Sequence, residues 1–496
     1  MLDFTSSYTK WLLVALIIIA TLLRMLYGFE NSLNYEEQVY WFISNQKSFA
    51  ELLLLIKKHL LSNNIVANFN PAIIITNYFP IKIAGYNEFI LRLPSLIYGV
   101  AAVPLSFFVA RKFYSETEGL IVAGFFAFSY FFIKNSQDIS SENLINLISL
   151  LYIIAAITFF DKIKDSNITS ISDSIFVILT GCAFGIYNIK GIILIIITLF
   201  LSFFLIKKIK TFLKAFLHFA IIILIISAYA YISNSYSIIS EKNIFSLQNV
   251  LINFNIIASN NIFITILIFL PLLFLLYIYI KKVFAPKSFG EDARTSFLNS
   301  TLFLSVYFFI GICFIILSVY FLKVKFSPNE LFFILVPIVI LTARALVLIS
   351  QKKSKQYFGI ILFIFFIVTN TYLIQNITSD KNPDYKSTAR YLMHKINNFP
   401  FSGIALSGPA HDFFSTAPNI FYIKKYNIKA PIFYFDSSRR NLPEIIQTAR
   451  QNNIKYLWYI NDKNMLYNYS EEYILKKYDI IEGLRYNKIT LMLVEL

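Results

Sequence analysis

Long apolar runs separated by short polar loops fill the first three quarters of the chain. A membrane hydrocarbon core of about 30 Å is crossed by about 20 helical residues. Runs near that length occur at roughly 10–29, 90–110, 118–134, 143–160, 174–188, 191–206, 213–232, 262–280, 300–322, 329–350 and 357–375. The pattern predicts about eleven transmembrane helices. The first run is too long for a signal-peptide core and no small-residue cleavage site follows it, so we interpret it as a retained helix.

Two longer polar stretches interrupt or follow these runs. Residues 30–89 form a first loop that is too long to be a simple linker. Its segment Phe49–Leu61 is amphipathic and carries a basic cluster at its end, Lys57, Lys58 and His59. Such a segment favours a helix lying in the membrane interface. We expect this loop to fold against the membrane and to cover a site.

The C-terminal tail alternates helical and strand patterns. Tyr385, Ala389, Leu392 and Ile396 recur at the spacing of one helix face. A short apolar run follows at 403–407. Strands are predicted at 431–435, 454–460 and 489–494, and a helix is predicted to open near residue 441. The tail is therefore expected to be a small α/β domain. The predicted division is an all-α membrane domain at 1–379, including the first outer loop at 30–89, and a tail domain at 380–496.

Composition and charge placement agree with a membrane protein. Hydrophobic residues make up 57% of the 496 positions, and the mean hydropathy is +0.63, which excludes an ordinary soluble chain. Lys and Arg gather in alternate short loops, which predicts a cytoplasmic N-terminus and an extracytoplasmic tail. The net charge of +16 is then mainly a topology signal. A nucleic-acid partner is not expected, because no basic patch with interleaved aromatic residues lies outside the apolar runs.

Paired acids just after the first predicted helix are the main chemical candidates. Glu36 and Glu37 are neighbours, and side chains of neighbours on a helix diverge by about 100°. Glu36 would then share a face with Tyr40, and Glu37 with Trp41. One carboxylate could act as a general base while the other makes structural contacts. The alternative is that both belong to a solvated loop face.

A second acidic position lies at the outer end of the third predicted helix. Asp138 and Glu142 are four residues apart and could share a helix face. Together with the first-loop glutamates, Glu36 and Glu37, they could hold a divalent cation through carboxylate oxygens; Glu36 and Asp138 are the first candidates. The alternative interpretation is that Asp138 caps the following helix.

Basic residues at helix ends are candidates for phosphate binding. Arg92 and Lys190 stand at outer helix ends, where a phosphate group is a natural partner. The alternative is that each snorkels to lipid phosphates. Arg24 and Arg344 lie deeper in their runs and allow the same two interpretations. The chain contains no nucleotide-binding glycine loop, so an enzyme of this kind needs an activated donor already in the membrane.

These motifs also occur in a characteristic order: Arg24, Glu36-Glu37-Gln38-Val39-Tyr40-Trp41, Phe89-Ile90-Leu91-Arg92-Leu93-Pro94-Ser95, Ser136-Gln137-Asp138 and Asn188-Ile189-Lys190-Gly191. In that order the chain resembles bacterial GT-C glycosyltransferases, the membrane enzymes similar to protein O-mannosyltransferases and to the transferase that adds aminoarabinose to lipid A. The resemblance implies that Glu36, and after it Glu37, takes the general-base position. It places Asp138 at the second acidic position, and Arg92 and Lys190 at the basic ones.

The resemblance implies sugar transfer from a polyprenyl-phosphate donor to a lipid, glycan or protein acceptor. The reaction would take place at the outer face of a bacterial inner membrane. Two departures stand out: Asn68-Phe69-Asn70-Pro71 lacks the His that often precedes this proline, and Ser140 stands where an Arg is frequent. A catalytically silent assembly factor is therefore one alternative. A transporter or flippase is another, and it predicts charged residues along the bundle midplane.

Overall fold

A computed structural model describes most of the helical part of the chain and most of the tail. The described residues are 7–28, 32–33, 35–60, 71–85, 87–139, 142–166, 171–187, 195, 216–226, 304, 332–350, 356–376, 384–407, 417–435, 442–462, 469–486 and 489–496. The chain packs as two compact units. We call residues 1–26, 95–137 and 141–375 the helical unit, and residues 27–94, 138–140 and 376–496 the first-loop–tail unit.

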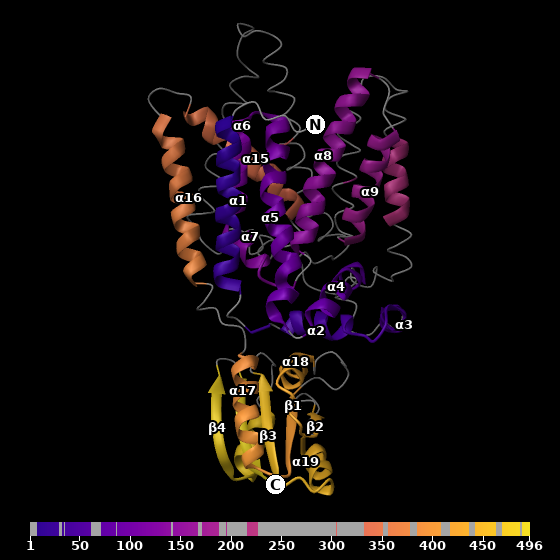
Figure 1. The fold of residues 1–496 in the computed structure, drawn as a ribbon, viewed down its shortest axis with the longest axis vertical. Coiled ribbons are helices and arrows are strands. Elements are labelled where there is room, and N and C mark those ends of the chain that lie inside the picture. The colour runs from indigo at the N-terminus through magenta and orange to yellow at the C-terminus, as the bar shows by residue number, and fades with distance from the viewer. Residues whose placement is uncertain are drawn as a thin grey trace. The chain divides into compact units, whose positions relative to one another are not determined.

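The helical unit is built from long apolar helices (Figure 1). They are α1 (Ser7–Gly28), α5 (Glu88–Phe113, from Ser95 onward), α6 (Glu116–Phe128), α7 (Tyr130–Asn135), α8 (Glu142–Ser166), α9 (Ile171–Tyr187), a helix over Phe216–Ile226, α15 (Phe332–Ser350) and α16 (Gln356–Asn376). Two described helices, Ser7–Leu26 and Glu88–Phe113, are long and apolar enough to cross a membrane. The predicted runs 191–206, 262–280 and 300–322 fall outside the described residues, apart from Ile195 and Leu304.

One predicted span is wrong in detail. The apolar run 118–134 is not a single helix, because α6 ends at Phe128 and α7 begins at Tyr130. Ser129 between them has an extended backbone, with φ −64° and ψ 125°. A break of this kind leaves backbone carbonyls without their intrahelical donors, and the groups that satisfy them are described with the site below.

Two glycines of α9 let it approach a neighbouring helix closely. Gly181 and Gly185 of α9 face the helix over Phe216–Ile226, and a Cβ atom on Gly185 would lie 2.0 Å from Ile226 Cδ1. Small residues four positions apart let helix backbones approach closely, which favours helix pairing within a bilayer.

The first loop forms three helices of the first-loop–tail unit. They are α2 (Tyr35–Ser44), α3 (Phe49–Leu60) and α4 (Pro71–Ala84). Helix α3 confirms the helix predicted over the amphipathic segment. Helix α2 is held against the end of α4, where Trp41 Nε1 donates to the Gly85 oxygen at 3.1 Å. Gly85 has φ +56°, a left-handed conformation that suits glycine at a helix C-terminus.

The tail is an α/β domain around one mixed sheet, as predicted (Figure 1). Its elements are α17 (Tyr385–Lys395), a 3-10 turn (Ile396–Asn398), β1 (Ser402–Ser407), α18 (Ala417–Lys425), β2 (Ile432–Phe435), α19 (Leu442–Gln451), β3 (Tyr456–Asp462), α20 (Tyr469–Lys477), β4 (Ile480–Tyr486) and β5 (Ile489–Glu495). The strand order is β2-β1-β3-β5-β4. Strands β1, β2 and β3 pair in parallel, whereas β5 pairs antiparallel with β3 and β4. The three predicted strands are confirmed and the short apolar run 403–407 lies in β1, whereas α18, α20 and β4 were not predicted.

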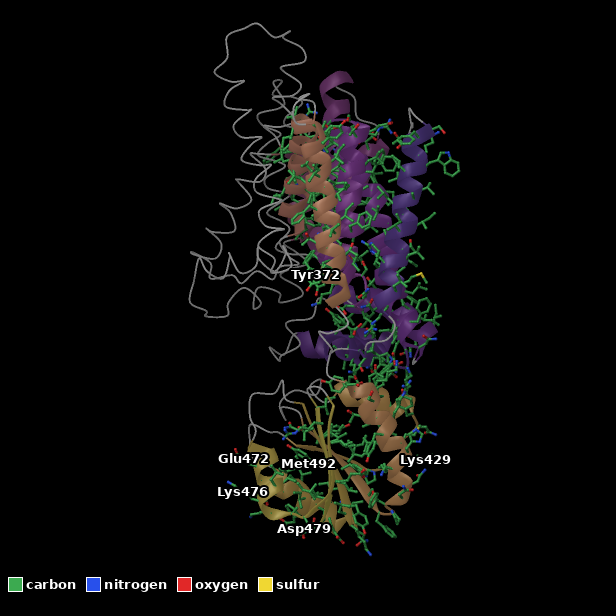
Figure 2. The ribbon with its side chains drawn as sticks, turned by 90° about the vertical axis from the view of Figure 1, so that its left-hand side faces the viewer. Tyr372, Lys429, Glu472, Lys476, Asp479 and Met492 are labelled. Atoms are coloured by element: carbon green, nitrogen blue, oxygen red, sulfur yellow. The ribbon has the colours of Figure 1, made fainter. Side chains whose placement is uncertain are left out.

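Helices cover both faces of the tail sheet. On one face Leu442, Ile446 and Ala449 of α19 pack in the same core as Met492 of β5. On the other face the ring of Tyr391 in α17 meets Trp458 of β3 edge to face at 6.2 Å. Figure 2 shows Met492 within the sheet and charged residues such as Glu472, Lys476 and Asp479 at the periphery. The sheet core is therefore closed by its own helices.

Candidate functional site

Helix α2 turns Glu37 inward, on the same face as Trp41, and both side chains are about 1% exposed. The Glu37 carboxylate accepts two hydrogen bonds from Arg92, from Nε to Oε1 at 2.8 Å and from Nη2 to Oε2 at 2.8 Å. The backbone N–H of Ile139 donates to the same Oε1 at 3.0 Å. A two-pronged Arg–carboxylate pair fixes both side chains in one geometry. The Glu37 carboxylate therefore makes structural contacts.

Arg92 joins three segments of the first-loop–tail unit. Its side chain is 3% exposed, and a charge that is buried this deeply needs a paired counter-charge. Besides Glu37, Arg92 Nη2 donates to the Ser32 backbone oxygen at 3.2 Å. The half-buried Asp138 carboxylate interacts with Arg92 electrostatically. The chain around 32–37, the start of α5 and the segment 138–139 therefore converge on one guanidinium group.

The structure brings together three of the predicted site residues, Glu37, Arg92 and Asp138. Glu36 lies in α2, but its side chain is outside the described residues, and so is Lys190. The general-base role of Glu36 and phosphate binding by Lys190 therefore stay predictions. Phosphate binding by Arg92 also stays a prediction.

A metal site at Glu36 and Asp138 likewise stays a prediction. Glu142 begins α8, but its side chain is outside the described residues. Among the described residues, no group of three or more His, Cys, Asp or Glu side chains is arranged to hold a metal ion. The Glu37 carboxylate is already engaged by Arg92 and Ile139. The positions of the two departures, Asn68–Asn70 and Ser140, also fall outside the described residues.

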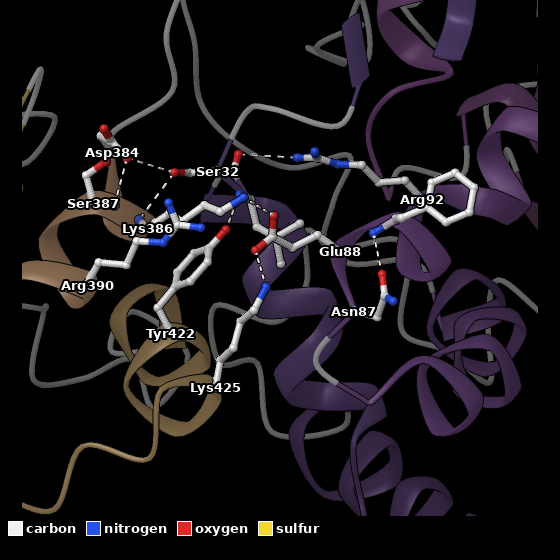
Figure 3. Close-up of polar contacts among 12 residues, drawn as sticks. Ser32, Asn87, Glu88, Arg92, Asp384, Lys386, Ser387, Arg390, Tyr422 and Lys425 are labelled. Carbon is white, nitrogen blue, oxygen red and sulfur yellow. Dashed lines mark hydrogen bonds and ion pairs between the residues drawn. The ribbon is translucent and has the colours of Figure 1, made fainter. Parts of the chain in front are cut away.

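A second charged cluster was not predicted from the sequence (Figure 3). Glu88, in the first turn of α5, is paired through Oε2 with Lys386 Nζ at 3.0 Å and through Oε1 with Lys425 Nζ at 2.5 Å. Asn87 caps this turn, since its Oδ1 accepts the Phe89 N–H at 3.0 Å. The cap is a sequence signal for a helix start. The lysines lie 298 and 337 positions further along the chain, so no local pattern identifies them as partners.

Tyr422 of α18 lies beside this cluster and is fully buried. Its hydroxyl oxygen accepts the Leu33 N–H at 2.8 Å. Burial raises the pKa of the Tyr422 hydroxyl above its ordinary value, and the negative charge of Glu88 raises it further. Tyr422 is therefore a neutral hydrogen-bonding group at physiological pH.

Arg24, in the helical unit, has a role that neither sequence interpretation described. It is 1% exposed, and its Nη2 donates to the Phe126 oxygen at 2.9 Å. Its Nη1 contacts the Ala127 oxygen at 3.4 Å, and its Nε donates to Ser136 Oγ at 3.0 Å. Phe126 and Ala127 stand just before the break between α6 and α7. Arg24 thus replaces the helical donors that the break removes.

Arg344 is also paired within the helical unit. Its Nη1 forms an ion pair with Glu118 in the first turn of α6, and its guanidinium lies 4.9 Å from the ring centre of Tyr114. Glu118 has no exposed side-chain surface, so a charged partner offsets the cost of burying it. The pair connects α15 to α6.

No protein-family model and no curated protein matches the sequence. Solved structures do match the fold. ArnT from Cupriavidus metallidurans in the apo state has a TM-score of 0.56 at 12% identity, covering 98% of both chains. The same protein bound to undecaprenyl phosphate has a TM-score of 0.53 at 11% identity, again covering 98% of both chains.

A second similar structure is the apo oligosaccharyltransferase of Archaeoglobus fulgidus. Its TM-score is 0.54 at 12% identity, covering 93% of this chain and 70% of the archaeal one. That archaeal enzyme has also been solved in complex with Zn and sulfate. The likeness extends over nearly the whole length of this chain, helical unit and tail included. The chain therefore shares the fold of ArnT and of the archaeal oligosaccharyltransferase.

Proposed function

We propose that this protein transfers a sugar from a polyprenyl-phosphate donor to an acceptor hydroxyl. The reaction would occur at the outer face of a bacterial inner membrane, with the tail on that side. The observation that carries the proposal is the buried Glu37–Arg92 pair, which holds α2 and its second acid, Glu36, next to the segment carrying Asp138. The GT-C fold supports the same reaction class.

We assign different roles to the two neighbouring glutamates, Glu36 and Glu37. Both Glu37 oxygens accept hydrogen bonds from Arg92, so this carboxylate is poorly placed to accept a proton from a substrate. We therefore assign the general-base role to Glu36, the other acid of the pair. Glu37 is then a positioning residue, which fixes α2, the helix that carries Glu36.

The reaction is a single displacement. Glu36 takes the proton of the acceptor hydroxyl as its oxygen attacks the anomeric carbon of the donor sugar. The bond between the anomeric carbon and the phosphate oxygen breaks, and polyprenyl phosphate leaves with the bonding electrons. Lys190 and the positive charge of Arg92 stabilise the phosphate as negative charge develops on it. One displacement inverts the anomeric centre.

A divalent cation is a further proposed partner. Asp138 and Glu36 would supply its oxygen ligands, and the cation would add positive charge near the donor phosphate. Arg92 interacts electrostatically with Asp138, so this cation would lie near a positive charge as well as near its acidic ligands.

The test is mass spectrometry of envelope glycolipids and glycoproteins from cells with and without the gene. Complementation with Glu36→Gln is compared with complementation by Glu51→Gln, which removes an exposed acid of the same loop. We expect one defined sugar to be absent from the deletion and Glu36→Gln strains and present with Glu51→Gln. Full transfer by Glu36→Gln would rule out this base. An unchanged glycan profile with accumulated lipid-linked precursor would indicate a transporter instead.

Charge placement in the described residues does not favour the transporter. The buried charges of the helical unit, Arg24 and the Glu118–Arg344 pair, bind protein groups at helix ends and at a helix break. A solute path needs charges that can exchange their partners with the solute.

A further inference from the structure

Two consecutive residues, Ser32 and Leu33, connect the tail to Arg92. The Ser32 hydroxyl donates to Asp384 Oδ1 at 3.2 Å and accepts the Lys386 N–H at 3.3 Å. The Ser32 backbone oxygen accepts from Arg92 Nη2 at 3.2 Å. One residue is therefore fixed by α17 on one side and bound to Arg92 on the other (Figure 3).

Leu33 is held in the same way from two directions. Its N–H donates to the Tyr422 hydroxyl at 2.8 Å, and its oxygen accepts from Gln38 Nε2 at 2.9 Å. Gln38 directly follows Glu37 in α2. Leu33, Gln38 and Tyr422 have no exposed surface. Buried backbone groups that lose their partners are costly, so this part of the chain has little freedom while the tail stays in contact.

The tail also holds the first turn of α5 by charge. Glu88 and Arg92 are four residues apart, and so lie on one face of α5. Lys386 and Lys425, both from the tail, contact the Glu88 carboxylate. The tail therefore contacts α5, the helix that carries Arg92, and also Ser32, whose backbone oxygen accepts a hydrogen bond from Arg92. These contacts are only partly exposed to solvent, so salt screens them less than it screens surface pairs.

We propose that the tail is a positioning element of the Arg92–Glu37 pair. It acts through Ser32–Leu33 and through Glu88, and so sets the geometry of α2 at the proposed base. That the tail holds the Arg92–Glu37 pair is argued from these contacts alone. That this affects catalysis rests on the proposed function. A tail that served only as an independent acceptor-binding module would not need to contact both Ser32–Leu33 and Glu88.

The test follows the reactivity of Arg92 toward phenylglyoxal, an arginine-specific reagent, in the purified full-length protein in lipid nanodiscs. Peptide mass spectrometry reports modification at Arg92 and at Arg24, which is equally buried but belongs to the helical unit. Tyr422→Phe removes the acceptor for the Leu33 N–H. We expect Arg92 to react about fivefold faster, the ratio that corresponds to one lost buried hydrogen bond, with Arg24 unchanged.

A second variant replaces the two lysines, as Lys386→Met with Lys425→Met. Its matched control is Lys424→Met, an exposed lysine next to Lys425. The double variant should expose Arg92 more than Tyr422→Phe does, and the control should match the wild type. Unchanged Arg92 reactivity in both variants would overturn the proposal. An equal rise at Arg24 and Arg92 would also overturn it, because the tail would then contribute only to global stability.

Sugar transfer, measured in the same variants by the envelope assay, separates this inference from the proposed function. Faster Arg92 modification together with reduced sugar transfer supports both the positioning role of the tail and the proposed transferase function. Faster modification in a protein whose deletion changes no glycan supports the tail contact and contradicts the transferase.

Discussion

Arg24 Nη2 lies 2.9 Å from the backbone oxygen of Phe126, which places a buried guanidinium at the break between α6 and α7. On the other side of the break, Asn370 Oδ1 of α16 accepts the Tyr130 N–H at 2.9 Å. Backbone groups on the two sides of the break are thus hydrogen-bonded by side chains of α1 and α16. Ser136, the C-cap residue of α7, also accepts a hydrogen bond from Arg24 Nε, so α1 and α16 together hold both ends of α7.

Replacing Arg24 should destabilise the helical unit. Arg24→Met leaves the carbonyls of Phe126 and Ala127 without their donor, at about 1–3 kcal/mol for each unsatisfied group. Arg24→Lys keeps a charge but lacks the planar fork, so it should recover only part of the loss. Thermal unfolding in detergent measures the effect, with Lys10→Met, an exposed cation of the same helix, as the control. A wild-type Tm for Arg24→Met would contradict this role.

Asn370 can be tested against the next residue of α16. Asn370→Leu removes the oxygen that accepts the Tyr130 N–H, whereas the control, Thr371→Val, removes an exposed hydroxyl. Hydrogen–deuterium exchange of peptides covering 126–139 should speed up in Asn370→Leu and stay near the wild-type rate in Thr371→Val. Similar exchange in the two variants would show that the Asn370 hydrogen bond does not hold the break.

Glu37 and Glu36 should respond differently to the same change. Glu37→Gln removes the counter-charge of the buried Arg92, and breaking a buried pair typically costs about 3–5 kcal/mol. We therefore expect a lower Tm and reduced transfer from Glu37→Gln. Glu36→Gln should abolish transfer with little change in Tm. Comparison of Tm and sugar transfer separates the two roles, and an unchanged Tm in Glu37→Gln would argue against the structural one.

Gly99 should tolerate no side chain. A Cβ atom there would lie 2.1 Å from Ser136 Oγ and 3.1 Å from Arg24 Nε. Overpacking of this kind typically costs about 1–3 kcal/mol, so Gly99→Ala should lower the Tm. Combining it with Ser136→Ala removes the closest atom and should restore part of the loss. If the second substitution restores nothing, the clash at Ser136 is not the cause.

The first-loop–tail unit should lose stability at alkaline pH. Burial raises the pKa of Tyr422 above the ordinary value of 10.0. Because the folded-state pKa is the higher one, the stabilisation is complete below pH 10 and is lost as pH rises through the folded pKa. Chemical denaturation between pH 8 and 11.5 measures the slope. Tyr422→Phe should reduce it, while the raised pKa values of Tyr434 and Tyr478 keep some pH dependence.

Local patterns in the sequence were sufficient for most elements of the tail. The periodic Tyr385, Ala389 and Leu392 are buried in α17 as expected, and the β-rich runs form β1, β2, β3 and β5. Strand β4 was missed because exposed residues such as Ile480 and Ile481 weaken its alternating pattern. The break at Ser129 was missed because the residues around it are as apolar as those of an unbroken span.

The sequence by itself determined what depends on neighbours along the chain: the apolar runs, most of the tail strands, and the face that Glu37 shares with Trp41. Only the tertiary structure decided which groups meet. Arg92 pairs with Glu37 from 55 positions away, and Glu88 with lysines that are 298 and 337 positions away. Nothing in local spacing encodes such partners. A buried charge requires a counter-charge, but chain topology determines which one it receives.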